Sequence, residues 1–150
     1  MRPETLELKD AAATEALGAK VASALETGDM VCLWGGLGAG KTTLARGLIR
    51  ALTDPDEEAP SPTFTLVQTY EGPRFPVAHL DLYRLSGPEE LRELGLEEAM
   101  EEGAAVIEWP ERLGERLPPD RLDIRLSIEA EGRTAEIGRH GRWKDRKLEF

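Results

Sequence analysis

The segment from Gly35 to Thr42 constrains the fold of this chain more than any other stretch. It reads Gly-Gly-Leu-Gly-Ala-Gly-Lys-Thr, the P-loop pattern of a glycine, four free positions and Gly-Lys-Ser/Thr. Its glycines let backbone N–H groups turn inward around a chain of phosphates. Lys41 is expected to reach the β- and γ-phosphates, and the Thr42 hydroxyl to hold Mg²⁺. The residues expected to contact the nucleotide here are Gly38, Ala39, Gly40, Lys41, Thr42 and Thr43.

The residues on either side of this loop favour a strand–loop–helix unit. Met30 to Trp34 is an apolar run typical of a buried strand, and Leu44, Leu48 and Leu52 then recur at helical spacing. A helix that starts at the loop directs its N-terminal dipole at the phosphates. The sequence therefore predicts an α/β fold in which the P-loop lies at the carboxyl end of a strand, where open sheets bind ligands.

The remaining sequence predicts a single-domain, P-loop NTPase-like mixed sheet flanked by helices. A chain of 150 residues suits one domain, which buries about 70% of its unfolded surface. The segments 64–70 and 75–80 should form a hairpin, and 122–128 should pair with 133–139 across a turn at Gly132. Asp10 should cap a helix to about Thr27, and Ser86 with Glu89 should form a capping box for a helix to about Glu102. The other predicted elements are strands at 5–8 and 104–107, a loop at 54–62 and a loosely ordered charged tail from about 140.

Composition narrows the functional classes. The net charge of −10 disfavours direct binding to nucleic acid, because an acidic protein repels phosphate backbones at long range. The single cysteine, Cys32, lies in an apolar run, so we expect it to pack in the core as a free thiol in a reducing compartment. No apolar run approaches eighteen residues, and the N-terminus lacks the apolar segment of a signal peptide. A cytoplasmic protein without a membrane span is the expectation.

Two carboxylates are candidates for metal binding or catalysis beside the P-loop. Asp81 and Glu108 each end an apolar run, and NTPases hold Mg²⁺ with the loop hydroxyl and a carboxylate at the end of a neighbouring strand. Thr63 lies on a proline-stiffened loop that resembles a switch segment sensing the γ-phosphate. Trp109 follows Glu108 and could form a wall of the site. His79 shares the strand face of Asp81, but a lone histidine is usually structural.

These blocks together resemble one family, the TsaE (YjeE) ATPases of bacterial tRNA threonylcarbamoyladenosine synthesis. The P-loop alone would be unspecific. The resemblance covers most of the chain, and the combination of Leu-Asp-Leu-Tyr-Arg at 80–84 with Glu-Trp-Pro-Glu at 108–111 makes it specific. The family often has Asp where this chain has Gly36, a free P-loop position, so phosphate binding should remain intact.

The resemblance implies a small α/β protein that binds ATP or ADP and Mg²⁺ and hydrolyses ATP slowly by itself. It implies TsaB and TsaD as partners, contact with tRNA only through that complex, and ATP turnover that resets the complex between cycles. In family terms Thr42 and Glu108 look like magnesium ligands, and Asp81 like a second acidic group near the metal or the attacking water. Thr14 and Arg133 match positions that touch the nucleotide outside its phosphates.

Three other readings compete with this one. A GTPase usually selects guanine with an Asn-Lys-x-Asp segment, which a chain without asparagine does not contain. A small-molecule or nucleoside kinase would need an acceptor pocket, usually under an arginine-rich lid. A non-hydrolysing regulatory module would bind nucleotide only to change its affinity for a partner, and steady-state phosphate release separates it from an enzyme.

Overall fold

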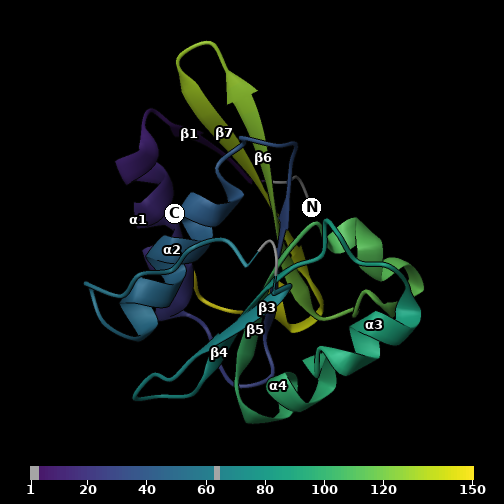
Figure 1. Cartoon of the computed structure of the whole chain (residues 1–150). Coiled ribbons are helices and arrows are strands. Elements are labelled where there is room, and N and C mark those ends of the chain that lie inside the picture. The colour runs from purple at the N-terminus through teal and green to yellow at the C-terminus, as the bar shows by residue number, and fades with distance from the viewer. Residues whose placement is uncertain (1–3, 63–64) are drawn as a thin grey trace.

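The computed structural model describes residues 4–62 and 65–150. Within them, seven strands form one sheet in the order β1-β7-β6-β2-β5-β4-β3 (Figure 1). The strands are β1 (Glu4–Leu8), β2 (Met30–Trp34), β3 (Val67–Tyr70), β4 (Val77–Asp81), β5 (Ala104–Glu108), β6 (Arg121–Glu129) and β7 (Gly132–His140). The helices are α1 (Ala11–Ser23), α2 (Lys41–Leu52), α3 (Pro88–Glu93), α4 (Leu96–Glu102), and the 3₁₀ segments η1 (Pro110–Arg116) and η2 (Gly141–Lys144).

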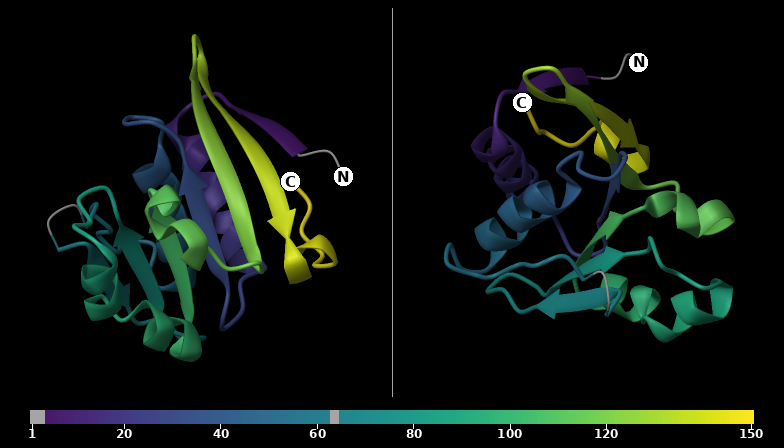
Figure 2. Two further views of the ribbon diagram at one scale, coloured as in Figure 1. Left: turned by 90° about the vertical axis from the view of Figure 1, so that its right-hand side faces the viewer. Right: turned by 45° about the horizontal axis from the view of Figure 1, so that its top comes forward.

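The sheet is mixed, as the sequence predicts. Strands β4, β5, β2 and β6 are parallel neighbours, while β3, β7 and β1 add antiparallel pairs toward the two edges. The β6–β7 hairpin extends beyond the other strands (Figure 2). Since β2, β4 and β5 run in the same direction, their carboxyl ends meet at one edge of the sheet, and the P-loop leaves β2 at that edge.

Helices cover both faces of the central strands, and α1 and α2 lie on the side opposite α3 and α4 (Figure 1). Side chains of β2 alternate between the two cores: Val31 and Leu33 pack with α1 and α2, and Met30 and Cys32 pack with the other layer. Strand β2 is therefore apolar along its length, as expected for a parallel strand buried on both faces. No helix in the described part of the chain is both long and apolar enough to cross a membrane.

Helices α1 and α2 approach each other closely through two glycines. A Cβ at Gly18 would lie 2.1 Å from the backbone oxygen of Leu44, and a Cβ at Gly47 would lie 2.1 Å from that of Glu15. Neither position has room for a side chain without a shift of the backbone. The contact fixes α2, and with it the P-loop, against the first helix.

The segment after His140 differs from the expected loose tail. Trp143 is fully buried, and Leu148 joins the core beneath α1 and α2. Asp29, which is fully buried just before β2, forms ion pairs with Arg142 (2.9 Å) and with Arg146. The tail is thus clamped to the start of the strand that leads into the P-loop.

Two helix predictions were wrong in their bounds. The first helix begins at its Asp10 cap, whose carboxylate accepts from Ala13 N–H, but ends at Ser23 rather than Thr27. The last turn tightens instead, since Leu25 N–H donates to Ala22 O, and Glu26 N–H donates to the Asp29 carboxylate rather than to a helix carbonyl. The helix expected over 86–102 is two helices, because Gly95 adopts a left-handed conformation (φ 73°) between them. The capping box is also absent in the expected form, since Ser86 N–H donates to Glu90 and not to Glu89.

Strand predictions were closer to the structure. Both hairpins form with antiparallel pairing. The first begins later than expected, at Val67, because Leu66 has a left-handed backbone (φ 66°). The second strand of this first hairpin, β4, runs from Val77 to Asp81, so Asp81 itself belongs to the strand. Phe64, expected to start the first hairpin, lies outside the described residues.

Candidate functional site

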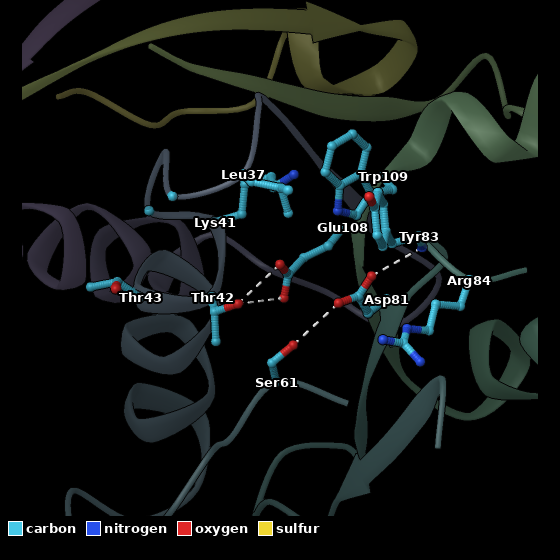
Figure 3. A pocket seen from close by; sticks show the side chains of 12 residues that line it. Leu37, Lys41, Thr42, Thr43, Ser61, Asp81, Tyr83, Arg84, Glu108 and Trp109 are labelled. Atoms are coloured by element: carbon cyan, nitrogen blue, oxygen red, sulfur yellow. Dashed lines mark hydrogen bonds between the residues drawn. The ribbon is translucent and has the colours of Figure 1, made fainter. Parts of the chain in front are cut away.

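A cavity of about 360 Å³ lies at the carboxyl ends of β2, β4 and β5 (Figure 3). We call it the P-loop cavity. The P-loop and the start of α2 form one wall, and the ends of β4 and β5 with their following loops form the other. Its lining residues are Leu37, Gly38, Gly40, Lys41, Thr42, Thr43, Ser61, Asp81, Tyr83, Arg84, Glu108 and Trp109.

Glycine geometry shapes the P-loop itself. Gly35, Gly38 and Gly40 have φ values of 144°, 78° and 105°, which side chains other than glycine rarely adopt. Gly40 is the last residue before α2 and has no side chain to cap it. The backbone N–H groups at this helix start therefore have no side-chain acceptor at the cap position, the arrangement in which helix N-termini bind phosphate.

Lys41 is buried and held in place by two contacts. Its ammonium group donates to the Gly35 carbonyl at 2.6 Å and lies 3.4 Å from the ring centroid of Trp109. Burial lowers the pKa of Lys41 below its usual 10.5, and nearby carboxylates, Glu108 foremost, oppose that shift. The result is a desolvated positive charge beside the loop.

Thr42 and Glu108 form a pair of hard oxygen groups across the cavity (Figure 3). The Thr42 hydroxyl lies 3.0 and 3.1 Å from the two carboxylate oxygens of Glu108. Glu108 is only 3% exposed, and its Oε2 also accepts from His79 Nε2 at 2.6 Å. Hydroxyl and carboxylate oxygens are the ligand types that Mg²⁺ prefers.

Asp81 is the second carboxylate of the cavity. It pairs in register with Glu108 across the parallel strands β4 and β5, which brings the two side chains to the same edge. Its Oδ1 accepts from the Tyr83 N–H at 3.0 Å, and its Oδ2 accepts from the Ser61 hydroxyl at 3.2 Å. Both oxygens are thereby fixed in direction.

Aromatic and apolar side chains border the cavity. The rings of Tyr83 and Trp109 lie 4.8 Å apart, and Trp109 has a left-handed backbone (φ 61°) at the end of β5. Leu37 of the P-loop is 68% exposed and Tyr83 is 41% exposed. The loops after β4 and β5 thus place an aromatic wall against Lys41.

The structure brings most of the sequence-predicted site residues together. Glycines 38 and 40, Lys41, Thr42, Thr43, Asp81, Glu108 and Trp109 all line the P-loop cavity, and Ala39 is buried between them in the loop. Thr63 lies outside the described residues. Sequence reasoning missed Ser61, although it stands two residues before Thr63, and it missed Tyr83 and Arg84, although both belong to the Leu-Asp-Leu-Tyr-Arg block.

Thr14 and Arg133 lie apart from the P-loop cavity. Thr14 is buried beside Gly40, and its hydroxyl donates to the Asp10 carbonyl at 3.3 Å. Arg133 donates to the Gly38 carbonyl at 3.1 Å. It also lines a second cavity, of about 720 Å³, between the end of β1 and the tip of the β6–β7 hairpin. Both residues therefore lie against the P-loop on a different side from Asp81.

Together, the sheet, the glycine loop and the lysine define the chain as a P-loop NTPase-like α/β protein. A family model described as "Threonylcarbamoyl adenosine biosynthesis protein TsaE" matches residues 8–137. The chain belongs to the TsaE family, as the motif resemblance indicated.

Individual relatives agree with the family model. A protein of Rickettsia felis named tRNA threonylcarbamoyladenosine biosynthesis protein TsaE is 41% identical over 77% of this chain and 67% of its own length. One of the same name from a Nostoc species is 43% identical over 87% of this chain and 82% of its own. The crystal structure of Bacillus subtilis YdiB is similar with a TM-score of 0.78 at 28% identity, covering 97% of this chain and 93% of YdiB.

Proposed function

We propose that this protein binds MgATP in the P-loop cavity and hydrolyses it. The observation that carries the proposal is the convergence of Lys41, the Thr42–Glu108 pair and Asp81 on one cavity at the carboxyl edge of the sheet. A P-loop, a hydroxyl and a strand-end carboxylate are the parts by which NTPases hold phosphates and metal. The absence of asparagine, and so of a guanine-reading Asn-Lys-x-Asp segment, favours ATP over GTP.

Thr42 and Glu108 fit a magnesium ion by their chemistry, since Mg²⁺ is usually held by one or two protein groups together with substrate phosphates. When bound, the ion would supply charge neutralisation on the phosphate oxygens. Lys41 would contribute a second positive charge from the P-loop side.

Asp81 has the role of orienting the attacking water in this proposal. Its two oxygens are fixed by Ser61 and the Tyr83 N–H, so its direction is set before substrate arrives. Thr63 is proposed to assist from the same loop as Ser61. Trp109 and Tyr83 would shield the phosphates from bulk water.

The biological role follows from the relatives, which are named for tRNA threonylcarbamoyladenosine biosynthesis. We infer that this chain acts in the cytoplasm with TsaB and TsaD, where its ATP turnover resets the transferase between cycles. Contact with tRNA would be indirect, in keeping with the net charge of −10. Thr14 and Arg133 would contact the nucleotide beyond its phosphates, from the side of the P-loop that faces the β6–β7 hairpin.

Steady-state phosphate release tests the enzymatic part of the proposal. The wild-type chain is measured with ATP and Mg²⁺, with and without TsaB and TsaD, beside Lys41→Ala. Release above the Lys41→Ala background is expected. A wild-type chain that binds ATP but releases no phosphate under either condition would instead be a regulatory module.

A further inference from the structure

Glu108 is held from two sides, and only one of them belongs to the P-loop. Thr42 approaches it from α2, while His79 approaches it from β4 with a 2.6 Å contact between Nε2 and Oε2. A carboxylate oxygen accepts and an imidazole N–H donates, so Nε2 carries a proton in this contact. We infer that His79 is a positioning residue, which fixes the Glu108 carboxylate in the direction required of a magnesium ligand. This inference rests on the proposed role of Glu108 and Thr42.

Burial separates His79 from the nucleotide. Its side chain has no exposed surface and lies opposite Val106 in the β4–β5 ladder, beneath the cavity rather than in it. His79 is not among the residues that line the P-loop cavity. Any influence on the nucleotide or on its metal must therefore pass through Glu108.

The second ring nitrogen argues against a purely structural role. His79 Nδ1 is buried and has no hydrogen-bond partner among the described residues, so the contact with Glu108 is the polar contact that the structure gives this ring. Burying an unpaired nitrogen costs stability that an apolar side chain of similar size would not cost. The position is better explained by the hydrogen bond to Glu108 than by packing.

The hydrogen bond from His79 to one oxygen of Glu108 also sets how the carboxylate faces Thr42. With Oε2 bound to His79, the carboxylate is held in one orientation facing the Thr42 hydroxyl. Groups that orient metal ligands in this way commonly change metal affinity by about 10–100-fold when they are removed. Without His79, the carboxylate could rotate away from Thr42, and more magnesium would be needed to fill the site.

Three substitutions of His79 separate hydrogen bonding from packing. His79→Leu removes the donor. His79→Gln places an amide NH₂ near the position of Nε2, so it should restore the contact. His79→Asn carries the same amide on a shorter side chain, which reaches only the position of Nδ1. Val77→Ala, at a fully buried residue on the same strand and face, is the control for loss of core packing.

The experiment is a calorimetric titration of the full chain with ADP, first in a metal chelator and then at increasing Mg²⁺. Mg²⁺ should increase the affinity for ADP. The Mg²⁺ concentration that gives half of this increase should rise about 10-fold or more in His79→Leu and His79→Asn, and stay near wild type in His79→Gln and Val77→Ala. ADP affinity in the chelator should be unchanged in all four variants. This split between metal and nucleotide would not arise from general loosening of the core.

Other results would overturn the inference. An unshifted Mg²⁺ requirement in His79→Leu would do so, as would an equal shift in Val77→Ala. If His79→Leu does not fold, equal requirements in His79→Gln and His79→Asn would overturn it instead. A wild-type chain whose ADP binding ignores Mg²⁺ would overturn the proposed magnesium site as well, so the two failures are distinguishable.

Discussion

Asp81→Asn and Glu108→Gln should produce different defects, although both carboxylates end neighbouring strands. Asp81 accepts from the Tyr83 N–H through Oδ1 and from Ser61 through Oδ2. An asparagine can keep its oxygen toward the Tyr83 N–H and turn its NH₂ to the Ser61 hydroxyl, which can accept. Ser61 is exposed, so its hydroxyl proton can turn to water, and the substitution should cost less than about 1 kcal/mol of stability. For a chain of this size, Tm should then fall by less than about 4 °C.

The catalytic consequence of Asp81→Asn should be much larger than its structural one. A positioned base or water-orienting group typically contributes about 10²–10⁴-fold to the rate, equivalent to about 2.7–5.4 kcal/mol in the barrier. MgATP affinity should stay near wild type, because Asp81 is assigned to the water and not to the metal. Single-turnover hydrolysis beside calorimetric binding measures the two effects separately.

Glu108→Gln is the matched variant. Its amide can also preserve both contacts, with oxygen toward His79 and NH₂ toward Thr42. The lost charge should raise the Mg²⁺ requirement for nucleotide binding, and turnover should fall at limiting Mg²⁺. If Asp81→Asn is the variant that loses magnesium binding, the two roles are reversed. If both turn over ATP like wild type, neither carboxylate acts in catalysis.

Three further predictions concern stability and nucleotide choice. Asp29→Ala removes a fully buried acceptor of Arg142, Arg146 and the Glu26 N–H, while Arg146 keeps Glu26 and Arg142 is partly exposed. The free energy of unfolding should fall by about 1–3 kcal/mol, lowering Tm by roughly 2–12 °C in calorimetry, and a fall below about 2 °C would refute the clamp. Gly47→Ala should lower the free energy of unfolding by about 1–3 kcal/mol, measured with denaturant, because its Cβ would meet the Glu15 carbonyl. Gly87→Ala, which has open space around it, should leave that free energy near wild type, and equal losses in the two variants would contradict the close helix contact. ATP and ADP should bind more tightly than GTP, and Lys41→Ala should weaken them; equal calorimetric affinity for GTP would refute the base preference.

Much of the site could be predicted because its parts are local in sequence. The glycines of the P-loop pattern determine the backbone conformation of the loop. The apolar runs before Asp81 and Glu108 mark strands whose carboxyl ends must meet in a parallel sheet. These two features predict that both carboxylates come to one cavity with Thr42, whichever helices cover the two faces of the sheet.

The rest depends on contacts between distant segments, which local patterns do not encode. The contact of Lys41 with Trp109 requires the left-handed backbone after β5, and the tail is ordered by Asp29, more than a hundred residues earlier. The hydrogen bond from His79 to Glu108 joins two strands, so the sequence showed only a lone histidine. Gly95 divides a segment whose helical propensity is otherwise continuous, because its left-handed backbone separates α3 from α4.

Phosphate release by the purified chain, with and without TsaB and TsaD, decides whether the P-loop cavity hydrolyses ATP. We expect slow release by the wild-type chain alone, faster release with both partners, and none above background from Asp81→Asn in either condition. The Asp81→Asn protein excludes a contaminating ATPase, because it should fold and bind MgATP as the wild type does. A wild-type rate that the partners leave unchanged, or that Asp81→Asn matches, would contradict the claim that this cavity is a partner-coupled ATPase site.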